Sequence, residues 1–389
     1  MTQATRLIRL KATFLDDSCV ATSLVGSESL SQPFQFQVAF QSITPVMQSQ
    51  DVIGQKVSVA LHPQGVEQPH YLHGRVSQLS LLDVTDNGAR LYQMTLVPGL
   101  WFLSQAGTNR IFENKTSLDI VQEVIKAYGA FCPLDVKVHK QYLRREYCVQ
   151  FNESDLAFVQ RLLAEDGINY YFTHTAGDHT LVLADIPGGF TDAPEAKVVV
   201  RGHSRVEGGE GVVVFDWQRT LRYHPQSCEQ LDYNQDTPKN FYRQRIPTTS
   251  KFSQVPAVAS VQHYGGYNFK SGESCHDFDA DYNKLLTQSW METLEFQHDV
   301  ATGKSNCMGF RSGARFELVH AVSSESGKYL LTEVWHQANN GGDEPDSYRN
   351  DFQCVPVTAP IRPPRQRLKR QMPGPQTAKV MSLSASGSA

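Results

Sequence analysis

The chain has 389 residues, of which 40% are hydrophobic and 20% charged, with a formal net charge of −4 at pH 7. This composition is typical of a globular protein, the length predicts two or three domains, and the charge argues against a domain-wide basic surface for nucleic acid. No apolar run reaches the length of a membrane span and the N-terminus lacks a signal-peptide core, so neither a membrane anchor nor classical secretion is expected.

Residues 1–110 are predicted to form a first β-rich domain. Between Phe34 and Phe40, apolar residues alternate with polar and small ones, so this strand should have one apolar face and one face rich in amides. Several further strands with few helices favour a barrel or a sandwich. They are expected at Val57–Leu61, Tyr71–Leu82 and Leu91–Val97, with a hairpin turn at Asp86–Gly88.

Residues 111–200 are predicted to form an inserted α+β module. A helix should begin at Thr116 or Ser117 and run to about Tyr128. The stretch from Tyr147 to Phe172 then predicts a complete strand–helix–strand unit. Asn152 and Ser154 are N-cap residue types, Leu156, Val159, Leu162 and Leu163 share one helical face, and Asp166-Gly167 provides the left-handed stop. Thr180–Ala184 is expected as a partner strand.

Residues 201–355 are predicted to form a second β-rich domain. Its one helix should run from about Asp279 to His298, and residues 225–256, which are polar and rich in proline, are expected to be long loops. Strands are predicted at Val212–Phe215, Arg219–Tyr223, Phe316–Val319 and Tyr329–His336. Residues 356–389 should form a solvated linker rich in proline and basic residues, followed by a strand from Gln376 that begins a truncated domain.

Common catalytic and metal-binding motifs are missing from the sequence. GxSxG, HExxH, the P-loop and GxGxxG do not occur. Asp277, Asp279 and Asp281 are spaced like the start of a calcium loop. However, Tyr282 takes the place of the required glycine and Gln288 that of the final glutamate, which favours the start of a helix.

The remaining polar groupings also have structural interpretations. His174 and His179 flank a predicted hairpin turn, where a solvated turn is a better hypothesis than a pair of metal ligands. Glu153 and Asp155 lie at a helix start, where they act as capping charges before they are a general acid–base pair. Seven cysteines are dispersed singly, which predicts apolar fillers or surface residues in a reducing compartment. No catalytic, cofactor-binding or metal-ligating residue is therefore predicted.

Several stretches together resemble one family closely. They are GLWFLSQAGTNRIFENKTSLDIVQEV (99–124), REYCVQFNESDLAFVQRLLAEDGINYYF (145–172), HTLVLADIPGG (179–189), and YRNDFQCVPVTAPIRPPR with PGPQTAKV (348–365 and 373–380). In their order and coverage they resemble VgrG, the spike protein of bacterial type VI secretion systems.

The resemblance implies a fold that is mainly β with α+β insertions, built on two β-barrel-like tube domains of the phage tail hub type. It also implies a homotrimer whose six barrels form a pseudo-sixfold ring that docks on the hexameric Hcp tube. An oligonucleotide/oligosaccharide-binding-type barrel and a needle would follow the region near residue 375.

A structural spike component of this kind would carry a membrane-puncturing tip for effector delivery, without enzymatic activity or a cofactor. Its partners would be other baseplate components, effectors and adaptors, and it would move from the cytoplasm to the outside or into a target cell on firing. Two alternatives stay open: a cell-wall or polysaccharide hydrolase, whose catalytic domain would lie beyond residue 389, and a carbohydrate- or peptide-binding β-module.

Overall fold

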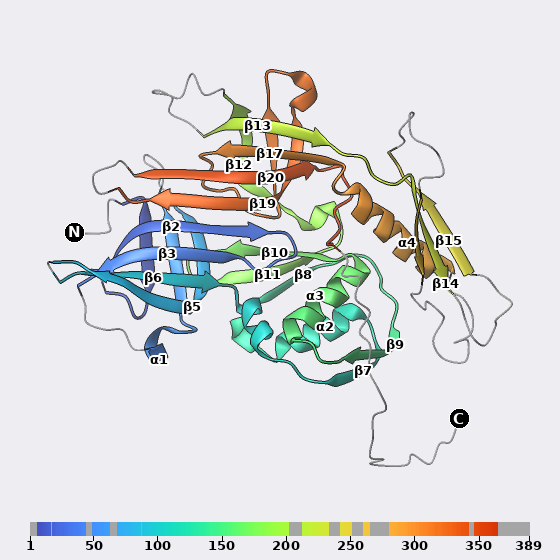
Figure 1. Ribbon diagram of the computed structural model, residues 1–389, viewed down its shortest axis with the longest axis horizontal. Coiled ribbons are helices and arrows are strands. Elements are labelled where there is room, and N and C mark those ends of the chain that lie inside the picture. Colours follow the sequence, from blue (N-terminus) through green and yellow to red (C-terminus); the bar gives the residue numbers. More distant parts are fainter. Residues whose placement is uncertain are drawn as a thin grey trace, which may run out of the picture.

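The protein is mainly β, as the sequence predicts, with two barrels and smaller α/β parts attached to them (Figure 1). The computed structural model describes residues 6–16, 18–43, 49–62, 68–86, 88–201, 212–232, 242–250, 260–264, 280–341 and 346–364. Among these residues no helix has both the length and the apolar character needed to cross a membrane.

The first barrel is a six-stranded antiparallel sheet wrapped around an apolar interior. Phe36, Val38 and Phe40 point into this interior and are fully buried, which confirms the alternation seen in the sequence. The strand order is β1 (Ile8–Ala12), β4 (Lys56–Leu61), β5 (His70–Val84), β6 (Arg90–Val97), β3 (Gln35–Ser42) and β2 (Val20–Ser29); a short helix α1 (Ser49–Val52) precedes β4.

The second barrel is closed, because each of its six strands pairs with two neighbours. It encloses its own core, in which Phe310, Phe316 and Phe352 pack together. Val212–Phe215 and Arg219–Tyr223, predicted as two strands, belong to one. The order is β18 (Ala314–Val319), β12 (Thr191–Val200), β13 (Val213–Leu221), β17 (Asp299–Ser305), β20 (Ser347–Pro356) and β19 (Gly327–Asn339), which returns to β18.

The two barrels share one uninterrupted sheet. β19 pairs with β18 near its start, and its second half, Glu333–Asn339, pairs with residues 23–29 of β2 in the first barrel. A single row of neighbouring residues therefore crosses both barrels. It runs through Gln35, Ser27, Trp335, Asp351, Lys304 and Asp216, on strands β3, β2, β19, β20, β17 and β13.

The inserted module confirms the predicted strand–helix–strand unit. Ser154 caps α3, and Gly167 ends it in the left-handed conformation with φ 70°. Thr116 caps α2 with a reciprocal capping box to Asp119. The elements are β7 (Arg110–Lys115), α2 (Ser117–Lys126), β8 (Leu134–Lys137), β9 (Arg145–Gln150), α3 (Asp155–Asp166), β10 (Asn169–His174) and β11 (His179–Ala184), with 3₁₀ turns at Gly99–Gln105, Gly129–Phe131, Pro187–Gly189 and Ser323–Glu325.

A small sheet with one helix replaces part of the loop region predicted at 225–256. Strand β14 (Ser227–Asp232) lies between β15 (Tyr242–Pro247) and β16 (Ser260–Tyr264), and α4 (Ala280–Glu295) packs on it (Figure 1). The prediction of loops was wrong because the apolar positions are few. Among the described residues, Cys228 and Ile246 form their small core with Trp290, Met291 and Leu294 of the distant helix.

The segment after β20 also corrects a prediction, since residues 361–363 are buried rather than solvated. Ile361 and Arg362 are each 9% exposed. Arg362 donates to the backbone oxygens of Gly167 and Asp185 and forms an ion pair with Glu292 of α4 at 2.6 Å. The predicted strand from Gln376 lies outside the described residues.

Candidate functional site

The hairpin β10–β11 places two histidines opposite each other. His174 and His179 are paired in register at the end of this hairpin, so the predicted turn is confirmed. The prediction that they are solvated was wrong, because their side chains are only 2% and 1% exposed. The hairpin end packs against β5 and the ring of Phe34, a long-range contact that local sequence does not reveal.

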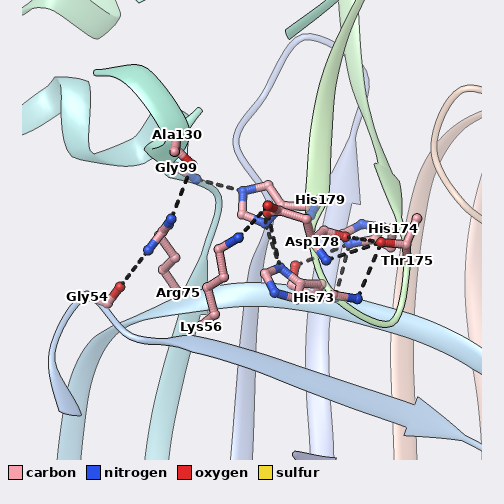
Figure 2. Close-up of polar contacts among 11 residues, drawn as sticks. Gly54, Lys56, His73, Arg75, Gly99, Ala130, His174, Thr175, Asp178 and His179 are labelled. Atoms are coloured by element: carbon pink, nitrogen blue, oxygen red, sulfur yellow. Dashed lines mark hydrogen bonds and ion pairs between the residues drawn. The ribbon is translucent and has the colours of Figure 1, made fainter. Parts of the chain in front are cut away.

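A third histidine, His73 of β5, completes this cluster, which sequence analysis missed (Figure 2). Its Nδ1 lies 2.8 Å from Nδ1 of His179, and Nε2 of His179 accepts a hydrogen bond from the amide of Gly99 at 2.8 Å. The carboxylate of Asp178 approaches both imidazoles at 3.9 to 4.0 Å and is bound by Lys56. No spacing motif joins residue 73 to residue 179, so only the fold could reveal this contact.

His73, Asp178 and His179 have donor atoms close enough together to suggest a metal site. The hydrogen bonds argue against it. Because Nε2 of His179 accepts from Gly99, the ring proton of the neutral imidazole must be on Nδ1, where it points at Nδ1 of His73. A metal on Nδ1 would require the loss of that proton, and the ammonium of Lys56 already neutralises Asp178. The cluster is a buried hydrogen-bonded pair of neutral histidines.

The titration of this pair follows from its burial. Desolvation lowers the pKa of His73 to about 4, with Asp178 opposing the shift. Desolvation and the neighbouring His73 lower the pKa of His179 to about 3. Both imidazoles therefore stay neutral at physiological pH.

The other acidic residues singled out in the sequence have structural partners. Asp281 is exposed in the first turn of α4, as the helix-start interpretation predicts, whereas Asp277 and Asp279 lie outside the described residues. Asp155 accepts hydrogen bonds from Arg110, Tyr128 and Gln150 at 2.7 to 2.9 Å. Glu153 is paired with Arg161 at 2.8 Å.

A further surface feature is the outer face of the sheet that joins the barrels, which we call the shared sheet face. Two shallow hollows of about 380 and 280 Å³ lie on it, and both are lined by Trp335 and Asp351. Trp335 is 56% exposed. Around it the hollows are lined mainly by amides and charged groups, among them Gln35, Gln37, Gln218, Lys304, Gln353 and Arg349. Polar side chains therefore surround one exposed aromatic residue, and Val25 and Phe352 add apolar lining to the two hollows.

Two barrels fused through one sheet, with an α/β module inserted between them, are the architecture of phage tail hub proteins. A family model described as phage tail baseplate hub (GPD) matches residues 27–342. The chain belongs to this family.

Relatives among characterised proteins confirm the resemblance to VgrG. The type VI secretion system spike protein VgrG1b of Pseudomonas aeruginosa is 26% identical over 98% of this chain, and VgrG1a of the same organism is 25% identical over 97%. The actin cross-linking toxin VgrG1 of Vibrio cholerae is 26% identical over 94%. The chain covers 50%, 58% and 34% of these proteins, so it spans about half the length of its spike relatives.

Solved structures with the same fold come from phages and from secretion systems. The c3393 protein of Escherichia coli, described as a type VI secretion component similar to bacteriophage T4 gp27 and gp5, superposes with a TM-score of 0.65 at 18% identity, covering 92% of this chain and 79% of that one. A 43 kDa tail protein of prophage MuSo2 from Shewanella oneidensis gives 0.60 at 11% identity, covering 91% and 99%. These likenesses support the hub fold itself.

Proposed function

We propose that this chain is the hub portion of a type VI secretion spike, in which it acts as a structural, load-bearing component without enzymatic activity. The proposal rests on the row of paired residues that runs from Gln35 to Asp216 across six strands. This row shows that the two barrels are joined in one sheet, whose outer face carries mainly polar side chains. Such a sheet resists the barrels sliding apart, because sliding would break a whole ladder of hydrogen bonds at once.

The same sheet supports a homotrimer. On β5, residues Gln78–Val84 extend past the region paired with β4, and on β13, residues Asp216–Leu221 extend past the region paired with β12. In the described part of the chain each overhang pairs with a strand on one side only. Unpaired edges favour addition of a further strand, and exposed apolar residues lie on both overhangs: Leu81, Leu82, Val84 and Leu221, each more than half exposed.

In this proposal the β5 edge of one copy meets the β13 edge of the next, and three copies close into a ring with the shared sheet face inward. The ring would dock on the hexameric Hcp tube, contact other baseplate components and carry effectors or their adaptors. It would assemble in the cytoplasm and leave the cell on firing. The proposed division of the chain is tube domain 1–110, module 111–200, tube domain 201–355 and connector 356–389, with β12 at the end of the module contributing a strand to the second barrel.

Light scattering after size-exclusion chromatography of the full-length protein tests the trimer. Leu82→Asp and Leu221→Asp should each place a charge in the proposed contact and shift the protein from trimer toward monomer at micromolar concentration. Leu143→Asp is the matched control, since Leu143 is exposed at a position outside both edges and should leave the trimer intact. A monomeric wild-type protein, or trimers in both edge variants, would argue against the arrangement.

A second candidate function is glycan binding by the shared sheet face. Trp335, flanked by amides and by the carboxylates of Glu333 and Asp351, has the chemistry that sugars stack and hydrogen-bond on. Calorimetric titration with peptidoglycan fragments tests this function. Saturable binding that Trp335→Ala abolishes would favour it, whereas the absence of heat would leave the hub as the better proposal.

A further inference from the structure

A buried carboxylate lies where the two barrels and the inserted module meet. Glu28 of β2 is 1% exposed, and its Oε1 contacts Nε2 of His336 on β19 at 2.9 Å. Nε of Arg311, in the loop before β18, lies 3.7 Å from the same oxygen. Its other oxygen, Oε2, faces Nε2 of His174 at 4.0 Å, and neither of these two atoms has a hydrogen-bond partner in the described structure. One side chain thus contacts all three parts of the molecule.

The hydrogen bonds around Glu28 are consistent with both histidines being neutral. Nδ1 of His174 lies 3.1 Å from the amide nitrogen of His73, from which it can accept, and 3.2 Å from the carbonyl oxygen of the same residue, to which it could donate. With the amide as donor, the ring proton of His174 is on Nε2, directed at Glu28. The side-chain amide of Asn350 donates to the hydroxyl of Tyr348, which can in turn donate to Nδ1 of His336 at 2.7 Å. The proton of His336 is then on Nε2 as well, again directed at Glu28.

A second proton on either imidazole would disrupt this arrangement. On His174 it would lose the hydrogen bond from the amide of His73 and leave only the carbonyl oxygen of that residue as a partner for Nδ1, and on His336 it would displace the hydroxyl proton of Tyr348. It would also add a cation beside Arg311 in a region closed to water. Burial and Arg311 lower the pKa of both groups, and that of His174 lies well below its usual value.

We propose that Glu28, His174 and His336 form an acid-sensitive latch, in which proton uptake by the two histidines opens the contact between the barrels and the β10–β11 hairpin. In the closed state both imidazoles remain neutral. In the open state they meet water and take up protons near pH 6.5, so acid shifts the equilibrium toward opening.

Every element packed against the latch contributes to its charge balance. Glu28 and Arg311 have opposite charges and compensate each other. Beside His73, the charges of Lys56 and Asp178 also compensate each other, because these two residues form an ion pair. The groups that face the two histidines are Glu28 from β2, His73 from β5, His179 from β11, Tyr348 and Asn350 from β20, and Arg311 from the loop before β18. The closed cluster is electrically neutral only while both histidines are neutral.

Hydrogen exchange of the full-length protein at pH 7.5 and pH 5.0, corrected for intrinsic rates, tests the latch. Peptides covering β2, β10 and residues 333–339 of β19 should open more often at pH 5.0. Each histidine that is neutral in the closed latch and titrates near pH 6.5 in the open latch should raise the equilibrium constant for opening by up to about 30-fold between pH 7.5 and pH 5.0. His174→Asn, which can keep an acceptor for the His73 amide, and His336→Gln, which can keep a donor for Glu28, should each remove one such factor.

His320→Asn is the matched control, because His320 is only half-buried and accepts a hydrogen bond from the amide of Val322 in a turn that is not among the groups facing Glu28. It should retain the full acid response. Unchanged exchange of the wild-type peptides between the two pH values would overturn the proposal, as would a full acid response in both latch variants. If one variant does not fold, the wild-type profile and the other variant decide.

Discussion

At the scale of single residues, two glycines with the same backbone conformation offer a matched test of close packing. Gly313 has φ 80°, and an added Cβ would lie 2.5 Å from the ring of the buried Tyr171. Gly88 has φ 81° with nothing within 4 Å of the same position. Both substitutions to alanine introduce backbone strain of about 1 kcal/mol, but only Gly313→Ala also forces a clash, which adds about 1–3 kcal/mol.

Urea unfolding should therefore show a markedly lower free energy of unfolding for Gly313→Ala than for Gly88→Ala. Equal losses in the two variants would mean that Tyr171 can move away without cost, and that the core around it is loosely packed.

The buried histidine pair predicts how stability depends on pH. The pKa of His73 is lowered to about 4 in the folded protein, whereas an unfolded histidine titrates near 6.5. Between these values the unfolded state binds more protons, so stability falls as pH decreases through this window. At pH 5 one such histidine lowers the free energy of unfolding by about 2 kcal/mol.

His73→Asn tests this prediction, because the asparagine oxygen can take the position of Nδ1 and accept from His179. Thermal unfolding from pH 7.5 to 5 should show a smaller loss in this variant than in the wild type. The same loss in both proteins would show that His73 is not the group responsible.

At the scale of elements, Asn340 closes the first barrel in place of a strand ladder. Its side-chain oxygen accepts from the amide of Ile8 on β1, and its nitrogen donates to the backbone oxygens of Ile8 and of Ala21 on β2, all at 2.8 to 2.9 Å. β1 otherwise pairs only with β4 among the described strands. Asn340→Ala should leave these buried backbone groups without partners, at a cost of about 1–3 kcal/mol each.

Hydrogen exchange of β1 measures the effect, since the amide of Ile8 should lose most of its protection. Asn340→Asp keeps the acceptor for Ile8 but removes both donors, so it should protect that amide better than alanine does. If β1 stays fully protected in Asn340→Ala, its contact with β4 is sufficient by itself.

At the scale of the whole molecule, the sequence predicts what depends on nearby residues and misses what depends on distant ones. The alternation in β3 and the caps of α2 and α3 are local patterns, and the structure confirms them. The pairing of β2 with β19 joins residues far apart in the chain and leaves no periodic trace. The role of His73 cannot be predicted for the same reason, and the turn motif predicts a solvated His174 because it does not show what packs on it.

The shared sheet predicts that the two barrels unfold as one cooperative unit. Phe36 is fully buried in the first barrel, and Phe36→Ala should remove about 3–5 kcal/mol of stability. Because β2 pairs directly with β19, this loss should reach the second barrel, so hydrogen exchange in β17 and β20 should rise together with exchange in β3. Met291→Ala is the control, since Met291 belongs to the separate small core of α4, Cys228 and Trp290. It should loosen β14 and β15 while leaving both barrels protected, and a second barrel that keeps its protection in Phe36→Ala would show that the joint transmits no stability.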